Sequence, residues 1–302
     1  MQEIGQQYSK DDLTGRSGFL RRARLHQSKY RAEILNLPYD KFGNYLTKED
    51  GERGKNFYEG FGIFDAVKDY RNYNKPLYSN MLRSEHIPFN FFVPFNRSNE
   101  SKVFCKNVFN EFLDNTIHTV NKIIIEYAPP IKENYLNDGT SFDAYIEYTQ
   151  IDGHNGIIGI EVKYTEKEYA LKAYSKQENE IKDRSSKYFT VTETCRIYKP
   201  NSIDLLITDN FRQVWRNHIL GESILIQDKD KFKYFTSLTM FPQDNIHFEK
   251  VSKEYIDLLV ENTNKFIPLT YEDFLAACYK HCKVENYKHW LDYLTNRYIV
   301  KN

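Results

Sequence analysis

Two strand-like runs separated by a polar turn constrain the fold of this chain more than any other feature. They are SFDAYIEYTQ at residues 141–150 and NGIIGIEVKYTE at residues 155–166. The connection contains Asp-Gly and Asn-Gly, the strongest short-range signals for a β-hairpin. The sequence therefore predicts two antiparallel strands. A register centred on Asp152 places Asp143 directly across from Glu161.

Side-chain alternation along these strands brings three charged groups together. Glu161 and Lys163 share the face that carries Asp143, whereas Phe142 and Ala144 point to the other face. Directly opposed side chains have Cβ atoms about 5 Å apart, so the two carboxylates repel each other unless a cation bridges them. Mg²⁺, which one or two carboxylates with water and phosphate oxygens can hold, fits this pair, as does Mn²⁺. With a lysine to orient water or neutralise charge, the pattern indicates phosphodiester hydrolysis.

The order Asp, hairpin, Glu-x-Lys on an apolar strand resembles the PD-(D/E)xK nuclease superfamily, which has the restriction-endonuclease-like fold. Asp143 matches its first acid, Glu161 its second acid and Lys163 its lysine, while Phe142 stands where a proline often precedes the aspartate. The motif covers residues 141–165, with looser support over 80–245. The resemblance implies an α/β fold with a central mixed sheet flanked by helices, and a Mg²⁺-dependent hydrolase of nucleic acid, usually DNA. It favours an endonuclease over an exonuclease.

The resemblance also implies residues outside the hairpin. Many members supply an acid from a helix before the sheet, and Glu85 or Glu111 could fill that place. Glu85 is preferred because it adjoins an apolar segment expected to pack on the sheet. Some members carry a glutamine or basic residue on a helix after the lysine strand. Gln213 and Arg216 are therefore candidates for contacts with substrate phosphate.

The rest of the chain reads as one composite domain, residues 1–302, because no Gly/Ser-rich or Pro-rich linker divides it. We expect a mainly helical part over 1–120, the nuclease-like core over 121–245 and a helical part over 246–302. Hydrophobic periodicity predicts the individual elements. The expected helices are 17–37 (basic and amphipathic, as one helix or a helix pair), 102–120, 167–187, 203–220 and most of 253–298. The further strands are 122–128 and 232–241.

Composition excludes little. Lys+Arg and Asp+Glu number 42 each, so no net charge attracts polyanions and a nucleic-acid surface must come from local clusters such as residues 17–37. The 4 cysteines are scattered, as is usual in a reducing compartment, and the start of the chain lacks the apolar region of a signal peptide. We therefore expect a cytoplasmic protein that does not enter membranes. A homodimer with two sites stays open.

Three alternatives compete with the nuclease interpretation. The chain could be a nuclease-like fold that binds nucleic acid or protein without cleaving it. It could also be an interaction protein that forms an oligomer through its 24 Tyr and 21 Phe residues. Finally, Glu161 and Lys163 could form a cross-strand salt pair on a solvent-facing strand.

Overall fold

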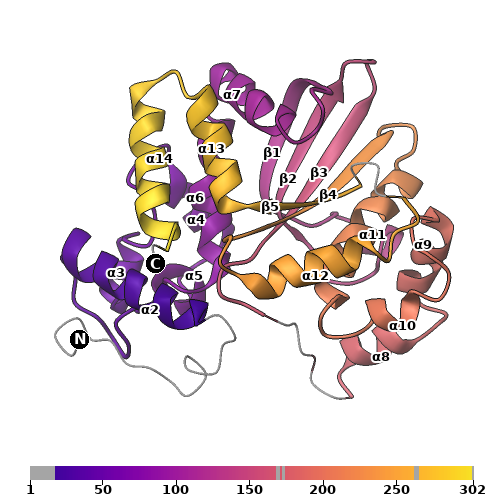
Figure 1. The fold of residues 1–302 in the computed structure, drawn as a ribbon, viewed down its shortest axis with the longest axis horizontal. Coiled ribbons are helices and arrows are strands. Elements are labelled where there is room, and N and C mark those ends of the chain that lie inside the picture. Colours follow the sequence, from indigo (N-terminus) through magenta and orange to yellow (C-terminus); the bar gives the residue numbers. More distant parts are fainter. Residues whose placement is uncertain (1–17, 168–170, 172–173, 262–264, 301–302) are drawn as a thin grey trace.

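A five-stranded mixed sheet forms the centre of the molecule in the computed structural model, which describes residues 18–167, 171, 174–261 and 265–300 (Figure 1). The strands lie side by side in chain order, with β1–β2–β3 antiparallel and β3–β4–β5 parallel. They are β1 (Ile117–Tyr127), β2 (Phe142–Gln150), β3 (Asn155–Val162), β4 (Tyr234–Phe241) and β5 (Phe266–Thr270). Helices flank this sheet, which confirms the predicted α/β class.

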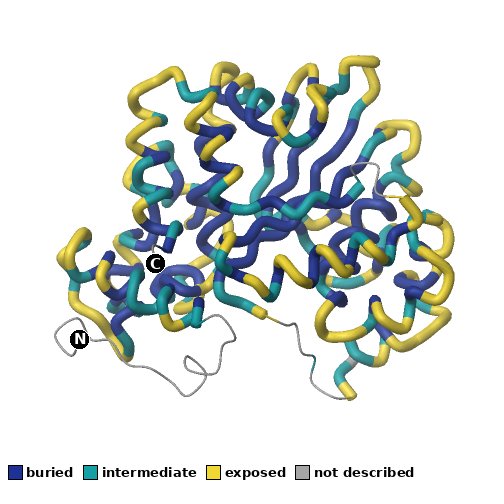
Figure 2. Tube along the Cα trace, viewed as in Figure 1, coloured by how far each residue is buried: buried dark blue, intermediate teal, exposed yellow. Residues whose placement is uncertain are grey.

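Two hydrophobic clusters cover the two faces of the sheet, because side chains alternate along each strand. Ile146 and Ile160 belong to one cluster, and Tyr145 and Ile157 belong to the other. The helices on the first face are α6 (Ile87–Phe92), α7 (Asn99–Asn110), α13 (Tyr271–His281) and α14 (Glu285–Tyr298). Those on the second face are α9 (Lys187–Cys195), α11 (Arg212–Gln227) and α12 (Ile246–Ile256). Burial is nearly continuous along the inner strands β3 and β4 (Figure 2).

Short helices are the remaining helical elements. They are α2 (Phe19–Lys29), η1 (Tyr30–Ile34), α3 (Lys48–Glu52), α4 (Ile63–Tyr70), α5 (Lys75–Ser79), η2 (Ser84–His86), η3 (Val93–Asn96), η4 (Lys132–Asn134), α8 (Lys176–Lys182) and α10 (Ile203–Leu206). No helix among the described residues is long and apolar enough to cross a membrane.

The basic segment predicted over residues 17–37 forms α2 and the π-helical turn η1, which together cover residues 19–34. Residue 17 lies outside the described part of the chain. Some of the segment's basic side chains bind other parts of the protein. Arg22 forms a 2.5 Å ion pair with Asp244, and the buried Arg31 donates to the carbonyl oxygen of Gly43. These two arginines therefore hold α2 and η1 against the rest of the fold.

The hairpin has the predicted register. Ala144 pairs with Ile160, so Asp143 stands across from Glu161, one step beyond the end of the ladder. The tight turn includes Gly153, whose φ of 84° is in the left-handed region that favours glycine. Turn chemistry and the alternation of apolar residues thus fix the register together.

The prediction for Phe142 is wrong, because its side chain does not join Ala144 on the α7 face. It belongs to the opposite cluster, where its ring lies 6.4 Å from the ring of Tyr145. A Cβ atom placed on Gly159 would come within 2.3 Å of the Phe142 ring. The Phe142 ring therefore occupies the space that a side chain at residue 159 would fill, and this space lies on the second face of the sheet.

Several predicted boundaries also differ. The helix expected over 102–120 ends at Asn110, because Asp114 and Asn115 adopt positive φ angles of 51° and 58° and the chain then enters β1. The helix expected over 203–220 is divided into α10 and α11, and β5 interrupts the C-terminal helical part. Of the helix expected over 167–187, α8 is present, and residues 168–170 and 172–173 lie outside the described residues.

Candidate active site

Three carboxylates lie in one row across the sheet. The pairs Ile125–Ala144 and Tyr127–Phe142 bracket Glu126 and Asp143 on neighbouring strands, and Asp143 in turn faces Glu161. The row therefore runs from β1 through β2 to β3. It lies where β2 begins and β3 ends, so the acids stand at one edge of the sheet.

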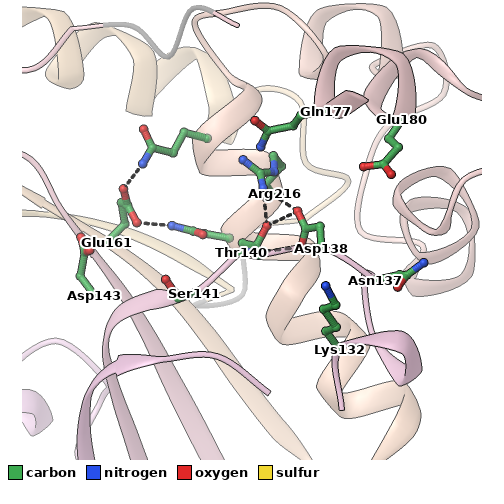
Figure 3. Close-up of a pocket in the computed structure, with 13 residues that line it drawn as sticks. Lys132, Asn137, Asp138, Thr140, Ser141, Asp143, Glu161, Gln177, Glu180 and Arg216 are labelled. Atoms are coloured by element: carbon green, nitrogen blue, oxygen red, sulfur yellow. Dashed lines mark hydrogen bonds and ion pairs between the residues drawn. The ribbon is translucent and has the colours of Figure 1, made fainter. Parts of the chain in front are cut away.

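Glu161 is held on both carboxylate oxygens. Lys163 Nζ lies 2.6 Å from Oε1, and the side-chain amides of Gln213 and Asn217 donate to Oε1 and Oε2 (Figure 3). Both members of the pair are buried, with Glu161 4% and Lys163 5% exposed. This burial contradicts a solvent-facing strand with a surface salt pair.

Asp143 and Lys163 have opposite electrostatic roles. Burial, together with the carboxylates of Glu161 and Glu126, raises the pKa of Asp143 well above its usual value, although its Oδ2 accepts a 2.6 Å hydrogen bond from the amide of Val162. Burial opposes the charge of Lys163, but attraction to Glu161 and Asp143 prevails and raises the pKa of Lys163. Lys163 is therefore an ammonium group at neutral pH and acts as a fixed positive charge.

Glu126 is a site residue that the sequence analysis missed. Burial raises its pKa to about 7; the hydrogen bond from the Tyr70 hydroxyl opposes this rise, and the carboxylates of Glu161 and Glu85 add to it. Its φ of 55° shows that the strand is irregular at this point. The available signal was an acid inside the apolar run KIIIEYA, at a position that the strand pairing brings beside Asp143.

The two candidates for the helix acid occupy different places. Glu85 lies in η2, accepts a 3.0 Å hydrogen bond from Arg83 and is near enough to influence the pKa of Glu126. Glu111 follows the end of α7 and forms ion pairs with Lys280 and His281, both at 2.7 Å. The surroundings of Glu85 therefore favour it, and its catalytic role stays a prediction.

The two candidates on α11 also differ. Gln213 contacts Glu161, and Asn217, one helical turn later, makes the matching contact. Asn217 was missed, although the spacing of four residues puts it on the same helix face as Gln213. The guanidinium of Arg216 instead forms a 2.5 Å ion pair with Asp138 and donates to Thr140 Oγ1 at 2.6 Å. Its predicted contact with phosphate remains untested.

Glu126→Gln should stabilise the metal-free protein at alkaline pH. Because the folded-state pKa of about 7 exceeds the ordinary 4.5, the wild-type carboxylate weakens the fold as pH rises through this interval. The glutamine amide is uncharged at every pH. The free energy of unfolding of Glu126→Gln should therefore equal that of wild type below pH 4.5 and exceed it by about 1 to 3 kcal/mol above about pH 7. Urea unfolding in EDTA at acidic and alkaline pH measures it. An advantage that is independent of pH would contradict this electrostatic account.

The chemistry of the site suits a hard divalent cation. Its ligands are carboxylate oxygens, which Mg²⁺ and Mn²⁺ prefer. Burial and neighbouring carboxylates raise the pKa values of Asp143 and Glu126, and a bound cation would offset their negative charge. In the part of the chain that the structure describes, no three His, Cys, Asp or Glu side chains form a group that could hold a metal ion. Asp143 and Glu161 would therefore need ligands from water or substrate.

The comparisons with known proteins agree with this geometry. A family model described as PD-(D/E)XK nuclease superfamily matches residues 11–300. Searches of curated proteins and of solved structures found no match. The family match extends well beyond the hairpin and includes the helices on both faces of the sheet. The chain therefore belongs to a family of the PD-(D/E)XK nuclease superfamily.

Proposed function

We propose that this protein is a metal-dependent nuclease that hydrolyses phosphodiester bonds in DNA. One observation carries the proposal: Glu161, fixed by Lys163, Gln213 and Asn217, faces Asp143 at the edge of the sheet. Membership of a nuclease superfamily supports hydrolysis of nucleic acid. DNA is placed ahead of RNA because the motif resembles superfamily members that usually cleave DNA.

In this proposal Asp143 and Glu161 hold Mg²⁺ or Mn²⁺. The bound ion would lower the pKa of water and offset charge on a phosphate oxygen. Lys163, already charged, stabilises negative charge that develops beside Glu161. Glu85 is retained as an auxiliary acid because its charge reaches Glu126. Gln213 orients Glu161, and Gln213 and Arg216 are retained as the residues that face the substrate.

A cleavage assay tests the proposal directly. Single-stranded and duplex DNA and RNA are incubated with Mg²⁺, Mn²⁺ or EDTA and with wild type, Asp143→Asn or Glu161→Gln. We expect turnover that requires metal and falls about a thousandfold in both variants. Asp152→Asn, a change of the same kind at the exposed hairpin turn, is the control and should retain activity.

Two further outcomes are informative. Cleavage of circular DNA, which has no ends, supports the proposed endonuclease over an exonuclease. No turnover on any substrate, with equal binding of DNA by all four proteins, overturns the proposal and favours a module that binds without cleaving.

Asn217→Ala should lower the cleavage rate about 10- to 100-fold, the usual range for residues that orient a metal ligand. Without this amide one oxygen of Glu161 loses its donor, so the carboxylate is less well oriented for the cation. The concentration of Mg²⁺ that gives half-maximal rate should therefore rise. A lower rate with an unchanged Mg²⁺ requirement would show that Asn217 does not act through Glu161.

A further inference from the structure

A cavity adjoins the carboxylates at the edge of the sheet where β2 begins and β3 ends. It extends away from them between α8 and α11. Its volume is about 520 Å³, within the range of roughly 300–1,000 Å³ that small-molecule sites occupy. Asp143 and Glu161 line one end and Lys132 and Asn137 the other, as Figure 3 shows. If a nucleic-acid strand binds with one phosphate at Glu161, a nucleotide next to that phosphate therefore lies beside this cavity.

Charge makes the inner part of the cavity unsuitable for phosphate. Apart from Asp143 and Glu161, which are assigned to the cation, the lining acids Asp138 and Glu180 balance the bases Lys132 and Arg216. Arg216 is also committed to Asp138, and both side chains of that pair are 9% exposed. A phosphate entering here would meet no net positive charge, so a neutral polar group is a better occupant.

The walls present hydrogen-bonding groups whose positions are fixed. Thr140 donates to Asp138 and accepts from Arg216. The Gln177 amide oxygen, in the orientation that satisfies its neighbours, accepts from both terminal nitrogens of Arg216 at 2.7 and 2.9 Å. Amide and guanidinium groups are those that recognise nucleobase edges. No aromatic side chain is among the lining residues described, so recognition would rely on hydrogen bonds rather than stacking.

We propose that this cavity receives one unstacked nucleobase next to the cleaved phosphate, an inference that rests on the proposed nuclease function. A base inside a duplex cannot enter, because its edge is paired and its faces are stacked. The substrate is therefore single-stranded or locally opened at the cleavage position. Since hydrogen bonds distinguish bases whereas stacking tolerates all of them, the enzyme prefers some bases at this position.

Abasic substitution tests the inference. A short fluorescein-labelled DNA strand, its duplex, and a set of strands each lacking one base in turn are titrated with protein in EDTA, where binding is measured without cleavage. The proteins are wild type, Gln177→Ala and the control Gln227→Ala. Gln227 is exposed at the far end of α11 and outside the cavity. The same strands are then cleaved in Mg²⁺.

We expect single strands to bind more tightly than the duplex, and loss of one particular base to raise the Kd about tenfold. Gln177→Ala should weaken binding of the intact strand to a similar degree and leave binding of that abasic strand unchanged. Gln227→Ala should change neither. In Mg²⁺ the sensitive base should adjoin the cleaved bond.

Three results would overturn the base site: abasic substitutions without effect at every position, equal weakening of intact and abasic strands by Gln177→Ala, or no binding by wild type. Cleavage without a sensitive base rejects the base site and leaves the nuclease function intact. A sensitive base in EDTA without cleavage in Mg²⁺ rejects the nuclease function and leaves the base site intact.

Discussion

Lys163→Met should abolish cleavage and also weaken the fold at neutral pH. Lys163 is the cation in direct contact with Glu161, and its charge also lowers the pKa of Asp143. Methionine keeps the apolar stem but leaves the carboxylates without this partner. We expect the rate to fall about a thousandfold. The free energy of unfolding should fall by about 3 to 5 kcal/mol, the cost of breaking a buried ion pair from one side.

Two controls separate catalysis from stability. In Lys163→Met/Glu161→Gln the unpaired carboxylate is also removed, so stability should partly return while activity does not. Lys265→Met breaks another lysine–glutamate pair, the 3.2 Å contact with the buried Glu222, and should leave cleavage by the folded protein intact. Urea unfolding and single-turnover rates measure both quantities. Full stability in Lys163→Met would show that the carboxylates do not depend on the ammonium.

Arg297→Met should destabilise the protein by about 3 to 4 kcal/mol, because Arg297 is a fully buried cation held by neutral oxygens. Its guanidinium donates to the carbonyl oxygen of Asn56 at 2.8 Å, to the side-chain oxygen of the same residue and to the Tyr293 hydroxyl at 2.5 Å. The rings of Tyr30, Tyr293 and Tyr298 surround it at 5.3–5.7 Å. The methionine variant leaves the Asn56 oxygens buried without these donors.

Arg297→Lys should recover little of this loss, since an ammonium group cannot reproduce the planar fork of donors. Arg184→Met, which removes an exposed arginine paired with Asp204, is the matched control and should change stability by less than about 1 kcal/mol. Thermal and urea unfolding measure the series. Equal stability of Arg297→Lys and wild type would show that charge alone matters here.

The hairpin could be predicted from the sequence because its information is local. Turn residues and alternation set the register, and the register alone brings Asp143 to Glu161. Ile157 and Gly159 lie on the same face of β3 as Glu161, and this composition favours a buried face over an exposed one. The central sheet and its flanking helices followed from the same periodicities and from the resemblance.

Contacts between distant segments were not predictable in the same way. Glu126 joins the site through pairing of β1 with β2, and the alternation of one strand does not reveal which residue of another lies opposite. The contact of Asn217 with Glu161 depends on how α11 is oriented against the sheet. The pairing of Arg216 with Asp138 depends on the position of the loop that carries Asp138. Phe142 lies on the other face because Gly159, three positions away along the partner strand, leaves space for its ring. Each of these depends on tertiary packing.

The place of Arg297 has a consequence for synthesis on the ribosome. The chain emerges from its N-terminus, so α2, α4 and the segment containing Asn56 are made long before α14. The segments containing Asn56 and Asn90 cannot reach the arrangement described here until Arg297 has been released, because the Arg297 guanidinium donates to the Asn56 carbonyl oxygen and the Trp290 ring donates to that of Asn90. The face of the sheet that α13 and α14 cover, opposite the face that α11 covers, is completed only at that moment.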